Sequence, residues 1–178
     1  MMPDAALTWI VVAALCALLV VAALGKLADL AKFSAAIQGY RLVPPGLAGL
    51  ASLALPCLEL AAAGCLLIPS LRTAGAWLAA GLLASYAAAM AINLARGRSN
   101  LDCGCFGPAR RERIASWMVV RNLVLAALAL ALTVPPPSRA LEALDWLTIS
   151  AGTFATVCLY LAIETLARNQ PIIRSARS

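Results

Sequence analysis

Long apolar runs constrain the fold of this chain more than any other feature. A helix needs about 20 residues, each adding about 1.5 Å, to cross a bilayer, and five runs approach or reach that length. They cover residues 5–24, 47–68, 74–94, 117–134 and 146–163. Hydrophobic residues make up 63% of the 178 residues and charged residues 12%, about half the charged share of an ordinary soluble domain. The sequence therefore predicts an integral membrane protein.

The pattern within the runs predicts helices. Only helices and closed barrels satisfy their backbone hydrogen bonds in hydrocarbon, and the runs show no alternation with a period of two. We expect an all-α, polytopic membrane bundle in which residues 1–178 form a single integral membrane domain, with a four-helix core and a fifth transmembrane helix. No lysine or arginine precedes the first run, so we expect a retained helix there and no cleaved signal sequence.

An amphipathic segment, GKLADLAKFSAAIQGYRLVPP, follows the first run. Its large apolar residues recur every three or four positions, with charged residues between them, which predicts a helix that ends before Pro44. The apolar residues are Leu27, Leu30, Phe33, Ile37 and Tyr40. Two interpretations remain open: a plain extension of the first helix that covers the bundle, or a gate or docking surface over a site in the membrane.

Basic residues are distributed unevenly between the two ends of the predicted spans. Of the 14, Arg72 and Arg139 lie on one face, Arg121 lies within the fourth span, and the remaining eleven share the other face. Those eleven are Lys26, Lys32, Arg41, Arg96, Arg98, Arg110, Arg111, Arg113, Arg168, Arg174 and Arg177. Because basic residues concentrate in cytoplasmic loops, the loop between the third and fourth runs should face the cytoplasm. The net charge of +6 suits anionic lipid headgroups, and no nucleic-acid partner is expected.

The six cysteines fall into two groups. The chain has no histidine, which excludes haem and zinc sites that depend on imidazole. Four cysteines lie in apolar runs, where a buried thiol usually behaves as a small inert hydrophobe. These are Cys16, Cys57, Cys65 and Cys158.

Cys103 and Cys105 differ, because they flank Gly104 in the polar stretch NLDCGCFGPARRER. Nearby arginines favour the thiolate by lowering the pKa of a thiol, and a glycine hinge eases the tight geometry that a disulfide between such close residues requires. Strained, exposed disulfides are the labile and catalytic ones. A redox dithiol is the favoured interpretation; a plain turn and a thiolate site for a soft metal are the alternatives.

Two ionisable residues lie within the predicted spans. Glu59 is near the middle of the second, and Arg121 is about two turns into the fourth. Such residues usually face the bundle interior or a water-filled cavity and mark function. We expect them to form an intramembrane polar pair, either a structural clamp between helices or part of proton or quinone handling. Cys57 points about 200° away from Glu59 on a helix, so the two need not share a site.

Several of these segments resemble the family of the methylamine utilization protein MauE, and more distantly the DoxX family. They are GKLADLAKF, YRLVPP, LPCLELAAAG, NLARGRSNLDCGCFG and VVRN, between about Gly25 and Asn122. The resemblance implies a multi-pass protein of the bacterial inner membrane with a four-helix core. It also implies a role in the maturation, processing or transport of the small (β) subunit of periplasmic methylamine dehydrogenase.

The implied client is rich in disulfides, which suits a membrane dithiol protein that assists their formation or isomerisation. The expected partners are that subunit or another disulfide-rich client, a thiol-redox protein and the bilayer, and a quinone in the bundle is the candidate electron acceptor. An accessory maturation factor is favoured over an independent thiol-disulfide oxidoreductase. The cytosol keeps thiols reduced, so direct delivery of a disulfide to a periplasmic client requires Cys103 and Cys105 on the periplasmic face. The distribution of basic residues instead predicts that they lie on the cytoplasmic face.

The residues are also compatible with three other functions. One is a DoxX-like thiol and quinone protein with a different client. Another is a carrier that passes a thiophilic metal or a small sulfur compound between thiolates, using Cys57, Cys65, Cys103 and Cys105. The last is a non-catalytic scaffold that docks a partner through the amphipathic segment.

Overall fold

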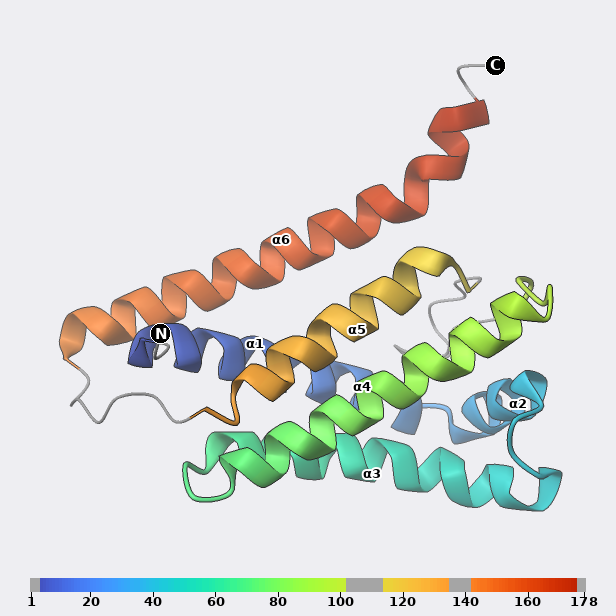
Figure 1. Ribbon diagram of the computed structural model, residues 1–178, viewed down its shortest axis with the longest axis horizontal. Coiled ribbons are helices and arrows are strands. Elements are labelled where there is room, and N and C mark those ends of the chain that lie inside the picture. Colours follow the sequence, from blue (N-terminus) through green and yellow to red (C-terminus); the bar gives the residue numbers. More distant parts are fainter. Residues whose placement is uncertain (1–3, 102–113, 135–141, 176–178) are drawn as a thin grey trace. The chain divides into compact units, whose positions relative to one another are not determined.

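The computed structural model describes residues 4–101, 114–134 and 142–175, and its regular elements are all helices (Figure 1). In chain order they are α1 (Ala5–Leu27), α2 (Leu30–Tyr40), the 3-10 turn η1 (Pro45–Leu47), α3 (Ala48–Leu67), α4 (Arg72–Ala95), α5 (Ser116–Ala131) and α6 (Ala143–Ser175). No strand occurs in these ranges. The predicted all-α fold is confirmed.

Four helices in the described ranges are long and apolar enough to cross a membrane: α1, α3, α4 and the Ala143–Ile163 part of α6. The predicted span at 117–134 instead forms the shorter helix α5. Its 16 residues extend about 24 Å, less than the roughly 30 Å of a typical hydrocarbon core. The chain is thus a polytopic helical membrane protein whose fourth predicted run is a short apolar helix.

The chain divides into two compact units. One is Leu15–Pro135, and the other combines Met1–Ala14 with Pro136–Ser178. In the second, Ile10 of α1 contacts Gly152 of α6, and a Cβ at Gly152 would lie 2.6 Å from the Ile10 Cδ1 atom. The candidate site lies wholly in Leu15–Pro135. The expectation of a single integral membrane domain stays a prediction.

Within Leu15–Pro135, the buried residues of α1 and α3 recur mostly at three- and four-residue intervals, as expected for one face of an α-helix. On α1 this face consists of Leu15, Cys16, Leu19, Ala22, Ala23 and Lys26. On α3 it consists of Ala48, Ser52, Pro56, Glu59, Ala62, Ala63 and Leu66. Each face therefore carries one charged residue into the interior, and these two residues form the centre of the site.

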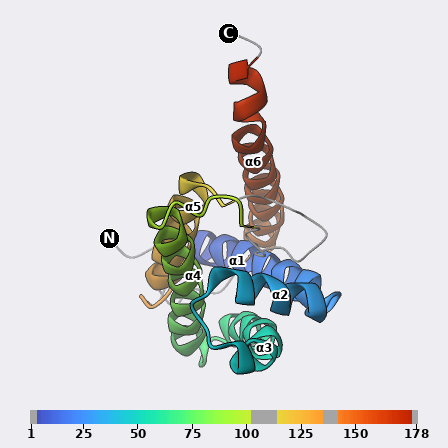
Figure 2. The same ribbon diagram turned by 90° about the vertical axis from the view of Figure 1, so that its right-hand side faces the viewer.

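The amphipathic segment forms a separate helix, so the interpretation as an extension of α1 is wrong. The chain turns after Leu27, and Asp29 caps α2 by accepting a hydrogen bond from the backbone N–H of Lys32 at 3.0 Å. Hydrogen bonds from the Lys32 side chain and backbone lower the pKa of the Asp29 carboxyl. Arg41, with φ of 52°, ends the helix in a left-handed conformation. Helix α2 then packs against α3 (Figure 2).

Helices α3 and α4 form a hairpin (Figure 1). Their backbones approach closely at Gly75. A Cβ at Gly75 would lie 2.7 Å from the backbone nitrogen of Leu66 and 2.9 Å from the carbonyl carbon of Cys65. Just before it, the Arg72 Nε donates to the carbonyl oxygen of Leu66 at 3.4 Å. Small residues permit this kind of backbone approach in membrane bundles.

We predict that Gly75→Ala separates α3 from α4 and destabilises the protein by about 1–3 kcal/mol, because backbone atoms of α3 occupy the space of the new methyl group. Gly81→Ala, in the same helix, is the matched control, since nothing lies within 4 Å of its added Cβ. Alanine has the higher helix propensity, so this variant should be neutral or more stable. Thermal melting in detergent compares the two; equal melting temperatures would refute the close approach.

Candidate functional site

The structure joins Glu59 of α3 to Lys26 of α1 in a buried ion pair. Each side chain is only 1% exposed, and the Lys26 ammonium contacts Oε1 of Glu59 directly. The Tyr86 hydroxyl of α4 donates a hydrogen bond to the same oxygen at 2.9 Å. Three helices therefore meet at one carboxylate. The other oxygen, Oε2, is buried and has no hydrogen-bond partner within the described ranges.

Aromatic rings complete the surroundings of Lys26. Its Nζ lies 4.8 Å from the ring centroid of Tyr86 and 5.7 Å from that of Phe33 on α2. A cation at these distances is attracted to the electron-rich ring face. A charge in the apolar interior requires such compensation, because an unpaired one is costly. The ammonium is held by one carboxylate and two rings.

This arrangement corrects the predicted pairing of Glu59 with Arg121. The carboxylate binds Lys26 and Tyr86, whereas the Arg121 guanidinium lies 5.2 Å from the ring centroid of Trp117, one turn earlier on α5. The prediction failed because Lys26 was assigned to a charged interfacial segment. A signal for its burial was present: Lys26 follows Leu15, Leu19 and Ala22 at intervals of four, three and four residues, on the buried face of α1.

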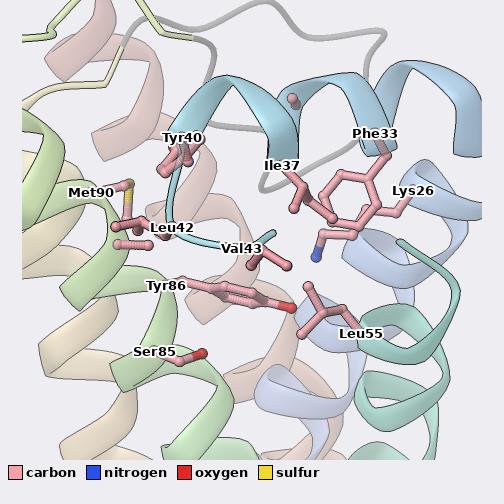
Figure 3. Close-up of a pocket in the computed structure, with 12 residues that line it drawn as sticks. Lys26, Phe33, Ile37, Tyr40, Leu42, Val43, Leu55, Ser85, Tyr86 and Met90 are labelled. Carbon is pink, nitrogen blue, oxygen red and sulfur yellow. The ribbon is translucent and has the colours of Figure 1, made fainter. Parts of the chain in front are cut away.

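A cavity of about 230 Å³ lies beside the ion pair, within Leu15–Pro135 (Figure 3). Among the described residues that line it, Lys26 is the only charged one. The others are Phe33, Ala36, Ile37 and Tyr40 of α2, Leu42 and Val43 after it, Leu55 of α3, and Ser85, Tyr86, Ala89 and Met90 of α4. Figure 3 shows the Lys26 ammonium and the Tyr86 hydroxyl pointing toward the same part of the cavity. An apolar pocket with a few convergent polar groups is typical of a small-molecule site.

The Arg-Gly-Arg run at residues 96–98 follows the last turn of α4 and contains its C-cap. Gly97, with φ of 71°, adopts the left-handed conformation that glycine accepts without strain. The N–H of Gly97 donates to the carbonyl of Leu94 at 3.0 Å, and the N–H of Arg98 donates to that of Asn93 at 2.9 Å. These two bonds form a Schellman motif, which ends α4 and reverses the chain.

Arg98 then ties this end of α4 to the end of α2. Its guanidinium donates to the carbonyl oxygens of Gly39 at 2.9 Å and Tyr40 at 3.5 Å, the last carbonyls of α2. It also donates to Oδ1 of the fully buried Asn93 at 3.1 Å. A cation is favourable at the negative end of a helix dipole. Arg98 therefore has a structural role in joining the amphipathic helix to α4.

Leu101 and Ile114, which flank the cysteine-containing segment (residues 102–113), lie next to each other. The N–H of Ile114 donates to the carbonyl of Leu101 at 2.9 Å. Ile114 packs with Met90 and Met118 in a buried cluster that Leu101, Tyr40 and Tyr86 also contact. Met90, Tyr40 and Tyr86 line the cavity as well, so the base of this segment shares side chains with it. Cys103, Gly104 and Cys105 themselves lie outside the described residues.

The remaining cysteines are free thiols in different surroundings. Cys16 is buried and donates to the carbonyl of Ala63 at 3.3 Å, Cys65 is partly buried, and Cys57 and Cys158 are exposed. Cys57 is exposed and Glu59 is buried, which agrees with the expectation that they point to different sides of the helix.

We predict that Lys26→Met alone destabilises the protein by about 3–5 kcal/mol, because it leaves Glu59 charged and buried without its counterion. The double variant Lys26→Met, Glu59→Leu should recover most of this loss, since both charges are removed together. Lys32→Met is the control, because that side chain is 65% exposed. Thermal melting in detergent measures all three; additive losses in the double variant would argue against the ion pair.

We also predict that Arg98→Ala loosens the end of α2 and costs about 1.5–3 kcal/mol, because carbonyl oxygens lose a charged donor. Arg96→Ala removes an exposed arginine two residues earlier and should change little. Hydrogen exchange of the α2 amides reports the local effect. Similar exchange in both variants would contradict the role assigned to Arg98.

Comparison with known protein families agrees with the resemblance drawn from the motifs. The family described as "Methylamine utilisation protein MauE" matches residues 4–135. That range includes the ion pair, the cavity and the cysteine-containing segment. No solved structure matches the chain.

Similar proteins carry the same description. A methylamine utilization protein MauE of Paracoccus denitrificans is 40% identical over 121 residues, which cover 68% of this chain and 65% of that protein, a little under two thirds of its length. One from Methylophilus methylotrophus is 35% identical over 150 residues, or 83% of this chain and 79% of the relative. One from Methylorubrum extorquens is 39% identical over 137 residues, or 76% and 74%. The chain belongs to the MauE family of methylamine utilisation proteins.

Proposed function

We propose that this membrane protein assists maturation of the methylamine dehydrogenase small subunit by exchanging disulfides through Cys103 and Cys105. The observation that carries the proposal is the family match, which spans residues 4–135 and so includes both cysteines. The relatives are described as methylamine utilization proteins, which makes a client in that pathway the most direct choice. The disulfide content that the family resemblance implies for the small subunit supplies the chemistry that a dithiol could serve.

The exchange transfers a disulfide from Cys103 and Cys105 to two thiols of the client, and this transfer needs no further reactant. A client thiolate attacks the Cys103–Cys105 disulfide and forms a mixed disulfide with one of the two sulfurs. A second client thiolate attacks the client sulfur of that bond, which releases the client disulfide and leaves Cys103 and Cys105 reduced. Two electrons and two protons pass from the client thiols to the pair. Run in reverse, the same steps reduce a wrongly formed client bond.

The surrounding fold supports the proposal by holding the base of the segment. Leu101 and Ile114 are joined by a backbone hydrogen bond at a buried cluster, and Arg98 fixes the end of α4 to α2. Reactive groups are positioned more precisely by elements that packing and hydrogen bonds support. Arg110, Arg111 and Arg113 follow the pair in sequence and would favour its thiolate form.

We predict that deleting the protein depletes the correctly disulfide-bonded small subunit while its transcript stays unchanged. Wild-type protein should restore the subunit, whereas the Cys103→Ser, Cys105→Ser variant should not. Cys57→Ser and Cys158→Ser are matched controls, because these exposed thiols lie on helices away from the pair in sequence. Non-reducing gels of the subunit provide the measurement. Full maturation by the double variant would exclude thiol chemistry, and normal maturation in the deletion strain would exclude the client.

The single variants test the exchange step itself. In a single variant the remaining thiolate can attack a client disulfide, which releases one client thiolate. The missing partner cysteine can no longer resolve the bond that forms, so a mixed disulfide with the client should accumulate. A membrane-impermeant maleimide added to intact spheroplasts reports which face carries the pair. Labelling before lysis fits direct exchange with a periplasmic client, whereas labelling only after lysis fits the distribution of basic residues and transfer of electrons across the bundle.

A further inference from the structure

The cavity beside Lys26 has the properties of a binding site for a neutral, lipid-soluble molecule. Its charged lining residue is already paired with Glu59, so the pair presents little net charge. An anionic ligand that bound Lys26 would compete with Glu59 and leave that buried carboxylate uncompensated. The other lining side chains are mostly aliphatic or aromatic. The wall therefore favours an uncharged ligand with a large apolar surface.

The ammonium of Lys26 selects for a hydrogen-bond acceptor on that ligand. An ammonium has three donors, and Glu59 is the oxygen acceptor that Lys26 contacts. The remaining attraction comes from the ring faces of Phe33 and Tyr86, which are weaker partners than an oxygen atom. Because Nζ lies at the cavity wall, a carbonyl oxygen in the cavity would be the better acceptor (Figure 3).

The volume and the opening narrow the class of ligand. A cavity of about 150 Å³ accommodates benzene, so 230 Å³ can hold one ring with small substituents. Aromatic side chains that line it, Phe33, Tyr40 and Tyr86, suit contacts with a flat ring. Ser85, which also lines the cavity, is exposed and lies in the middle of the apolar helix α4. The exposed edge of the cavity therefore faces the hydrocarbon layer, where an apolar tail could extend.

We propose that this cavity binds the ring of a lipid-soluble quinone, with one ring carbonyl accepting a hydrogen bond from Nζ of Lys26. A quinone combines a flat ring, carbonyl acceptors, no charge and an apolar tail, which are the four properties that the cavity selects. The proposal concerns binding alone. It does not depend on the thiol pair or on the client, so a chain with Cys103→Ser and Cys105→Ser should bind the quinone equally well.

The test uses the full chain in lipid nanodiscs with decylubiquinone as the probe. Decylbenzene, which has the same tail and a ring without carbonyls, controls for simple partition into lipid. We expect decylubiquinone to raise the melting temperature saturably, because a ligand that binds only the native state stabilises it, and native mass spectrometry should detect one quinone per chain. Decylbenzene should do neither. Equal behaviour of the two probes overturns the proposal.

Two sets of variants locate the site. Ala89→Leu fills the cavity, whereas Ala88→Leu adds the same side chain at the neighbouring exposed position, which does not line it. Only Ala89→Leu should abolish saturable binding. The double variant Lys26→Met, Glu59→Leu removes the donor without leaving a buried charge, and we expect about tenfold weaker binding, the loss of one good hydrogen bond. If Ala89→Leu does not fold, the double variant decides, and unchanged affinity in it refutes the site.

Discussion

The buried ion pair between Lys26 and Glu59 is the constraint on which the rest of this unit depends. Each charged residue lies on the buried face of an apolar helix. Either charge without its partner would destabilise the fold, because an unpaired charge in an apolar interior is costly. The pair therefore sets how α1 and α3 turn toward each other, and Tyr86 adds α4 through its hydrogen bond to the same carboxylate. Lipid offers no hydrophobic drive for helices to associate, so such polar contacts have a large role in choosing one arrangement.

A second set of contacts connects that pair to the segment containing Cys103 and Cys105. Gly97 ends α4, and Arg98 reaches back to the last carbonyls of α2, which also covers the cavity beside Lys26. Tyr40 and Met90 belong both to the cavity wall and to the cluster under Leu101 and Ile114. Movement of α2 would therefore alter the cavity and the base of the cysteine-containing segment together. The proposed quinone site and the proposed thiol site share these structural supports.

The sequence predicted the helices better than the contacts between them. The helical class, four of the five predicted spans and the family followed from hydropathy and short motifs, whereas the predicted span at 117–134 forms the short helix α5. Glu59 was identified as significant because a carboxylate in an apolar run is conspicuous. Lys26 was overlooked, since it lies at the end of a run where basic residues are common. Continuing the periodic face of α1 by one turn would have shown it to be buried.

The sequence alone determined the helical class, the long apolar helices, the end of the amphipathic helix before Pro44 and the family. These properties depend on local sequence: the length of each apolar run, the three- and four-residue spacing of the amphipathic segment, and the stretch around Cys103 and Cys105 that carries the family resemblance. Only the tertiary structure decided that Glu59 binds Lys26, that Arg98 holds α2, and that a cavity lies between them. The physical reason is that all three result from helices distant in sequence. Their rotation and closeness depend on packing the whole unit at once, including Gly75 between α3 and α4.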